Sequence, residues 1–129
     1  MDASALVKRY VAEPGSDVVR NAMAQADGWF MCRAGYVETI RAVSLAAGKK
    51  ATAAVREEWP AVGVIEIDQR LVEHAAELTI DLDLRSLDAL HLAAALVLPR
   101  EDLVIATWAR KLHAAARTTR LSLVPDTIP

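Results

Sequence analysis

The chain has 129 residues, of which 53% are hydrophobic and 25% are charged, and its formal net charge is −2. This length fits one domain, residues 1–129, and the composition is typical of a folded globular protein, which excludes a disordered chain. The small net charge excludes a large basic field that would bind nucleic acid or anionic membranes indiscriminately, although a local basic rim is compatible with it.

The first third of the chain predicts two helices followed by a strand. Residues 3–11 have apolar side chains at helical spacing, and the "EPGS" that follows ends this helix. Ser16 is placed to act as the N-cap of a second helix, which runs through Ala26. Trp29–Cys32 is short and apolar, as expected of a buried strand.

The middle of the chain predicts two consecutive helices and a second strand. A broad apolar stripe follows residues 34–47 and stops at Gly48, the residue type expected just past a helix end. Residues 49–59 form a further helix that ends before Pro60. The segment "VGVIEI", residues 62–67, predicts the next strand.

The last half of the chain continues the alternation of helices and strands. The predicted elements are a helix capped by Asp68 over about 69–82, a helix over about 86–98, a strand at 103–107, a short helix at 109–116 and a strand at 121–124. Short, continuously apolar strands between helices predict an α/β domain whose parallel sheet is covered by helices on both faces. In such sheets, functional sites form at the carboxyl ends of the strands.

Three acidic residues lie at helix starts or among apolar neighbours: Asp2, Glu38 and Asp88. Each has a structural explanation when taken alone. Asp2 can cap the first helix, and Glu38 can form an ion pair with Arg41, three residues on. Ser86 can cap the helix of Asp88, whose carboxylate the helix dipole then favours by roughly 0.3 to 1 kcal/mol.

Taken together, these acids point to a metal site, because an α/β fold tends to bring such element ends to one edge. Clustered carboxylates repel one another, so a cation is their natural compensation, and hard oxygen ligands select Mg²⁺ or Mn²⁺. Such an ion holds phosphate oxygens and activates a water for attack. The pattern therefore outlines a phosphoryl-transfer site with basic side chains nearby to position a nucleic-acid backbone.

Four segments carry a family resemblance in their order and spacing. They are "DASALVKRYVAEPGS" at 2–16, "YVETIRAV" at 36–43, "LRSLDALHLAAAL" at 84–96 and "IATWARKLHAAA" at 105–116. With these segments the chain resembles PIN-domain proteins of the VapC type, the toxin half of bacterial toxin–antitoxin pairs. The resemblance implies a PIN fold, a Mg²⁺-dependent endoribonuclease activity, a homodimer, and inhibition by a small cognate antitoxin of the VapB type.

The resemblance also implies roles for individual residues. The acidic motif positions fall on Asp2, Glu38 and Asp88, which would be the catalytic metal ligands. Ser4 would supply a hydroxyl that orients Asp2 or a water on the metal. Thr107 falls on the Thr or Ser that often shortly precedes the last acid of the family.

Two departures from the family pattern stand out. Ala109 occupies the position of the family's last Asp, so one metal could bind through the three remaining acids, while a second metal becomes doubtful. Only Met1 precedes Asp2, where family members have a central strand; either an upstream segment or another part of the chain would fill that place.

Two alternative functions follow from these departures and from the fold. The main alternative is a catalytically impaired PIN domain that serves as an RNA- or antitoxin-binding module, which Ala109 supports. A weaker alternative is a nuclease for structured DNA, against which the small size and the absence of a helical arch count.

Several further residues have competing interpretations. His91 is interpreted as a packed or hydrogen-bonded structural histidine, because a lone His among Leu and Ala rarely binds a metal. Trp29 is assigned to the core. Trp59 is expected to be partly exposed, where it could contact an antitoxin or a second protomer. The single cysteine, Cys32, is expected to be a small buried hydrophobe, and the lack of disulfides, signal peptide and long apolar run favours a reducing cytoplasm.

Four basic residues flank the segments that carry Asp2 and Ala109. They could line an RNA path or simply lie on solvated helix faces, and the sequence favours neither. These residues are Lys8, Arg9, Arg110 and Lys111.

Overall fold

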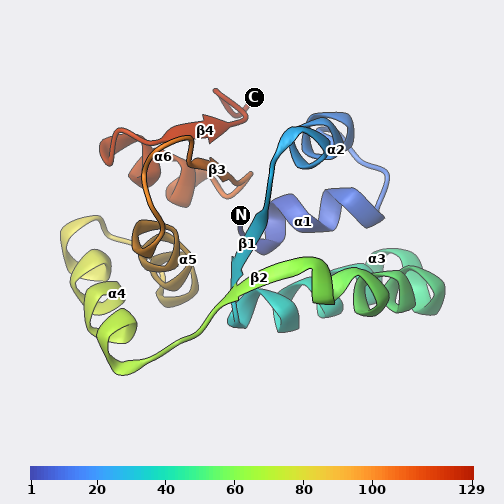
Figure 1. Cartoon of the computed structure of the whole chain (residues 1–129), viewed down its shortest axis with the longest axis horizontal. Coiled ribbons are helices and arrows are strands. Elements are labelled where there is room, and N and C mark those ends of the chain that lie inside the picture. The colour runs from blue at the N-terminus through green and yellow to red at the C-terminus, as the bar shows by residue number, and fades with distance from the viewer.

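The structure is a computed structural model that describes all residues, Met1–Pro129, and Figure 1 shows its arrangement. The helices are α1 (Ala3–Tyr10), α2 (Ser16–Gln25), α3 (Ala34–Glu58), the 3₁₀ helix η1 (Trp59–Ala61), α4 (Gln69–Asp81), α5 (Ser86–Val97) and α6 (Arg110–Thr118). The strands are β1 (Trp29–Cys32), β2 (Val62–Ile65), β3 (Val104–Ala106) and β4 (Ser122–Val124). Every predicted helix and strand is present.

The strands form two parallel pairs, β1 with β2 and β3 with β4, which confirms the predicted α/β class. The sheet is not continuous, because only Met1 and Asp2 lie between the pairs. The Met1 amino group donates to the Phe30 carbonyl of β1 at 3.0 Å. The Asp2 amide donates to the Ala106 carbonyl of β3 at 3.2 Å. These two residues thus place the first acid at the junction of the strand pairs.

Gly48 divides α3 as predicted. Its φ of 80° and ψ of −163° are outside the helical region, so the helix kinks there. Glycine adopts this positive φ without the steric cost of a Cβ. After the kink, the Thr52 hydroxyl donates to the Gly48 carbonyl at 2.9 Å.

The helix caps follow the sequence prediction in two places and differ from it in two. Asp2 caps α1, and Asp68 caps α4 by accepting the Leu71 amide at 2.8 Å. The predicted caps Ser16 and Ser86 are wrong, because each is the first helical residue rather than the preceding one.

The loop before α2 explains the misplaced cap. Gly15 takes the N-cap position with a φ of 93°, so Ser16 is already inside the helix. The Ser16 hydroxyl accepts the Glu13 amide and donates to the Val11 carbonyl, each at 3.0 Å. Ser16 therefore closes the loop that joins α1 to α2.

Two apolar clusters form the core. The larger one joins β3 to α4, α5 and α6, and the smaller one joins β1 and β2 to α1 and α2. Cys32 is buried in the larger cluster, as predicted, and Leu92 beside it is fully buried. Burial of one leucine side chain stabilises the fold by about 1.5–3 kcal/mol. In Figure 1, β1 runs between α5 on one side and α1 on the other, which is how both clusters reach the strands.

The two tryptophans considered in the sequence lie at the edge of the smaller cluster. Trp29 packs against that core and donates from its indole nitrogen to the Met23 carbonyl at 2.8 Å. Trp59 is half-buried and contacts Tyr36 with 4.9 Å between ring centroids. None of the helices combines the length and the apolar character that crossing a membrane requires.

Candidate functional site

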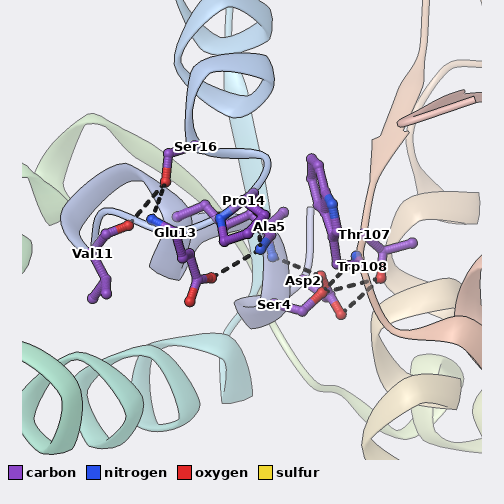
Figure 2. A network of polar contacts seen from close by, with 10 residues as sticks. Asp2, Ser4, Ala5, Val11, Glu13, Pro14, Ser16, Thr107 and Trp108 are labelled. Atoms are coloured by element: carbon purple, nitrogen blue, oxygen red, sulfur yellow. Dashed lines mark hydrogen bonds and ion pairs between the residues drawn. The ribbon is translucent and has the colours of Figure 1, made fainter. Parts of the chain in front are cut away.

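Asp2 lies at the start of α1 with its carboxylate almost fully buried, at 5% exposure. One oxygen, Oδ1, accepts the Ser4 hydroxyl at 2.7 Å and the Ala5 amide at 3.2 Å. The other, Oδ2, accepts the Thr107 hydroxyl at 3.0 Å. Figure 2 shows this network, in which donors from two distant parts of the chain fix the orientation of the Asp2 carboxylate.

Ser4 and Thr107 tie the Asp2 site to the segment after β3. The Ser4 hydroxyl accepts the Trp108 amide at 2.8 Å, and the Thr107 hydroxyl accepts the Ala109 amide at 3.1 Å. Thr107 is fully buried. Both hydroxyls named in the sequence analysis therefore contact Asp2 directly, and their bonds hold the start of α6 against α1.

Glu38 lies in the first half of α3, and its partner is not the one that the sequence suggested. Its Oε1 is 2.6 Å from Nε2 of His91 on α5, and no ion pair with Arg41 forms. The His91 side chain is 4% exposed and that of Glu38 is 30% exposed. His91 is therefore hydrogen-bonded as predicted, but its bond is to a predicted site residue.

The other ring nitrogen of His91 indicates which tautomer makes this bond. Nδ1 is buried and has no hydrogen-bond partner. A proton there would leave a buried N–H without an acceptor, which is costly. The environment thus favours a proton on Nε2, which donates to Glu38 and holds its carboxylate in place.

Asp88 is half-buried in the first turn of α5 and has no hydrogen-bond donor within the chain. Burial raises the pKa of Asp88, and the negative charges of Asp2 and Glu38 raise it further, while His91 and Arg85 partly oppose this. The structure therefore brings all three predicted acids into electrostatic range of one another.

The donor chemistry of this arrangement fits a hydrated hard cation. Asp88 faces two other carboxylates without any compensating donor, which a cation would supply. No three acidic, histidine or cysteine side chains converge closely enough to form a ready ligand shell. Mg²⁺ suits such a site, because it keeps several waters and needs few protein ligands.

Ala109 lies directly beside the Asp2 network, at the N-cap of α6. Its methyl side chain offers no cap to the helix. The position that departs from the family pattern is therefore at the edge of the acidic site, where an aspartate would serve both as a helix cap and as a fourth acid.

The four basic residues predicted to line an RNA path or a solvated face all have partners within the chain. Lys8 is buried, and its ammonium binds Glu13 at 2.9 Å and the Pro14 carbonyl at 2.8 Å. Arg9 pairs with Glu58 at 2.7 Å, Arg110 binds the Pro129 carbonyl at 2.6 Å, and Lys111 lies 3.5 Å from Asp83. The interpretation of Lys8 as a solvated residue is wrong.

A cleft of about 440 Å³ opens beside the acids, and sequence reasoning did not identify it. Ser4 and Glu38 line it on the side of the acidic site, and its wall also includes Lys8, Glu13, Arg41 and Trp108. Helical spacing placed Arg41 on the same face as Glu38, but that signal was interpreted as an ion pair.

Comparisons with known proteins agree with this fold. The PIN domain family model matches residues 1–117. Ribonuclease VapC45 and ribonuclease VapC49 of Mycobacterium tuberculosis are each 31% identical to this chain over 133 residues, which cover 96% of this chain and 92% of each relative. Ribonuclease VapC46 of the same organism is 30% identical over 124 residues, covering 96% of this chain and 94% of the relative.

A solved structure gives the same result for the fold alone. The crystal structure of Mycobacterium tuberculosis VapC20, described as a toxin that cleaves the sarcin–ricin loop, superposes with a TM-score of 0.64 at 17% identity. The match covers 74% of this chain and 79% of VapC20. With the family model and the relatives in agreement, the chain belongs to the PIN-domain family, and within it to the VapC type.

Proposed function

We propose that this protein is a toxin of a type II toxin–antitoxin pair that acts in the cytoplasm as a Mg²⁺-dependent endoribonuclease. The observation that carries the proposal is that the carboxylates of Asp2 at the N-cap of α1 and Glu38 on α3 both lie within electrostatic range of Asp88 on α5. Relatives covering almost the whole chain are named ribonucleases, which supports RNA as the substrate.

These three acids would hold the cation, and their neighbours would keep them in position. When bound, Mg²⁺, or Mn²⁺ in its place, would neutralise charge on the phosphate and make a water more acidic. Ser4 and Thr107 occupy both oxygens of Asp2, so this carboxylate does not rotate. His91 occupies Oε1 of Glu38 and leaves Oε2 without a partner in the chain.

Ala109 limits the proposed site to three carboxylates. We expect one hydrated cation rather than two, and less activity than a site with a fourth acid would have. The Ala109 amide still supports Thr107, so the substitution leaves the position of Asp2 intact.

We also propose a VapB-type antitoxin and a second copy of this chain as partners. This part of the proposal follows from membership of the VapC type, which the family model and the relatives support.

The test is RNA cleavage by the full chain in Mg²⁺ or Mn²⁺, with EDTA as the control and mapping of the new RNA ends. We expect cleavage that EDTA abolishes. The same preparation is titrated with Mg²⁺ while its thermal unfolding is followed, because an ion that binds only the folded state raises the melting temperature. Binding of RNA or antitoxin without any turnover would instead support the binding-module alternative.

A further inference from the structure

Arg41 is the basic residue of the cleft that the fold leaves without an ion pair. Its side chain is exposed and takes part in none of the ion pairs of the chain. Glu38, one helical turn away on α3, bonds to His91 and forms no ion pair with Arg41. By contrast, Lys8 and Arg9 on α1 are already neutralised by Glu13 and Glu58.

The cleft beside the acids places this free cation close to the reacting groups. Glu38 and Arg41 lie one helical turn apart on the same face of α3, and both line the cleft. Ser4, whose hydroxyl donates to Asp2, lines it from α1. The cleft therefore borders the acidic site through Ser4 and Glu38. Lys8 and Glu13 on its wall pair with each other, so Arg41 is its one cation without an ion pair.

Trp108 supplies an aromatic wall whose position is fixed. Its amide donates to the Ser4 hydroxyl at 2.8 Å, and the Lys8 ammonium lies 5.1 Å from the ring centroid. Gly15 lets the indole approach closely, because a Cβ at that position would lie 2.9 Å from three indole atoms. The indole ring thus packs against Gly15 and the Lys8 ammonium at the wall of the cleft.

We propose that this cleft is a nucleotide subsite for single-stranded RNA next to the bond that is cut. Arg41 contacts the phosphate, and Trp108 packs against the base. Guanidinium groups suit phosphate oxygens, and aromatic side chains commonly stack with unpaired RNA bases. This inference rests on the proposed ribonuclease function and deepens it, since it names the residues that would hold the substrate.

The first test compares Arg41→Ala with Arg70→Ala, which removes the same charge from an exposed arginine on α4, outside the cleft. Affinity for a short fluorescein-labelled single-stranded RNA of mixed sequence is measured by anisotropy in EDTA, over a series of salt concentrations. We expect Arg41→Ala to weaken binding about tenfold. We also expect the slope of log affinity against log salt to fall in magnitude by about 0.7, as for one lost phosphate contact. Arg70→Ala should leave both nearly unchanged.

The second test concerns the aromatic wall and compares Trp108→Leu with Trp108→Phe. Thermal unfolding verifies that both variants fold. We expect Trp108→Leu to lose about tenfold in affinity and Trp108→Phe to retain most of it, because only phenylalanine offers a ring for stacking.

The outcomes separate this inference from the proposed function. RNA binding that responds equally to Arg41→Ala and Arg70→Ala, or equally to the two Trp108 variants, overturns the subsite while leaving a ribonuclease intact. Failure of the unsubstituted chain both to bind and to cut RNA overturns the proposed function and the subsite with it.

Discussion

Asp2 and Asp88 are two carboxylates of the proposed site, and their surroundings differ. Asp2 is buried and accepts hydrogen bonds from Ser4, Ala5 and Thr107. Asp88 is half-buried, accepts none within the chain, and has a pKa raised by burial and by the charge of Asp2. Asp2 is therefore held by hydrogen bonds, while Asp88 has none and its charge is only partly compensated by His91 and Arg85.

This difference indicates how the site divides its tasks. The hydrogen bonds of Asp2 connect α1 to the start of α6, so a change there disturbs folding as well as chemistry. Asp88 accepts no hydrogen bond within the chain, so a change there should disturb folding less than a change at Asp2. Substitutions at the two acids and their neighbours should consequently separate stability from activity.

The largest expected effect is that of Asp88→Asn on RNA cleavage. Loss of one of three charges should reduce the cleavage rate by a hundredfold or more, on the order of several kcal/mol. The melting temperature should stop responding to Mg²⁺. The matched control is Asp17→Asn, since Asp17 is also a first-turn acid, in α2, and lies outside the site. Equal cleavage by both variants would remove Asp88 from the proposed site.

The same variant tests the pH dependence of stability. Because the native pKa of Asp88 is raised above its unfolded value, the stabilisation from its protonation is fully present below the unfolded pKa. It is lost as pH rises through the native pKa. Without metal, Asp88→Asn should therefore unfold at the same or a higher temperature than the unsubstituted protein near neutral pH. Below the unfolded pKa of Asp88, the melting temperature of the unsubstituted protein should rise relative to that of the variant.

Next in size is the effect of His91 on Glu38. His91→Leu removes the donor to Glu38 and should reduce Mg²⁺ affinity or activity about 10- to 100-fold, as observed when groups that orient metal ligands are lost. His91→Gln can place an N–H near the position of Nε2 and should recover part of the loss. The cleavage rate of both variants is measured over a Mg²⁺ titration. An identical Mg²⁺ dependence for His91→Leu and His91→Gln would show that the hydrogen bond to Glu38 is unimportant.

A pair of buried threonines tests the hydrogen bonds of Asp2. Thr107 and Thr39 are both fully buried, but the Thr107 hydroxyl binds Asp2 and Ala109, whereas the Thr39 hydroxyl has no partner. Thr107→Val should destabilise the fold by about 1–3 kcal/mol, because it leaves buried polar groups unpaired. Thr39→Val should be neutral or stabilising. Urea unfolding of both variants measures the difference, and similar losses would contradict it.

The smallest expected effect is at Ala109, whose amide donates to the Thr107 hydroxyl that binds Asp2. Ala109→Asp and Ala109→Asn each give α6 an N-cap that it lacks, which is worth about 1 kcal/mol. Only Asp adds a fourth carboxylate, so only Asp should also increase Mg²⁺ affinity and cleavage. Thermal melts and Mg²⁺ titrations of the two variants separate the effect of helix capping from that of the added charge. An equal gain in cleavage by Ala109→Asn would mean that the added charge has no effect on cleavage.

Much of the fold could be predicted from local sequence patterns. Hydrophobic spacing identified each helix and strand, and Gly48 marked the kink in α3. The two misplaced caps, Ser16 and Ser86, show the limit of such patterns, because a serine before a helix fits either the cap or the first turn. Gly15 could take the cap only because its positive φ costs glycine little.

The sequence by itself determined the alternation of helices and strands, the family, and the three acids, since each depends on residue types at short or regular spacing. Only the tertiary structure decided which charges meet. Glu38 had Arg41 within one turn, yet it pairs with His91, which is 53 positions away. Packing of α3 beside α5 buries the imidazole and brings it within 2.6 Å of the carboxylate, while an exposed pair along one helix gains little over water. Burial and packing between helices therefore determine that Glu38 bonds to His91, and local sequence patterns do not contain this information.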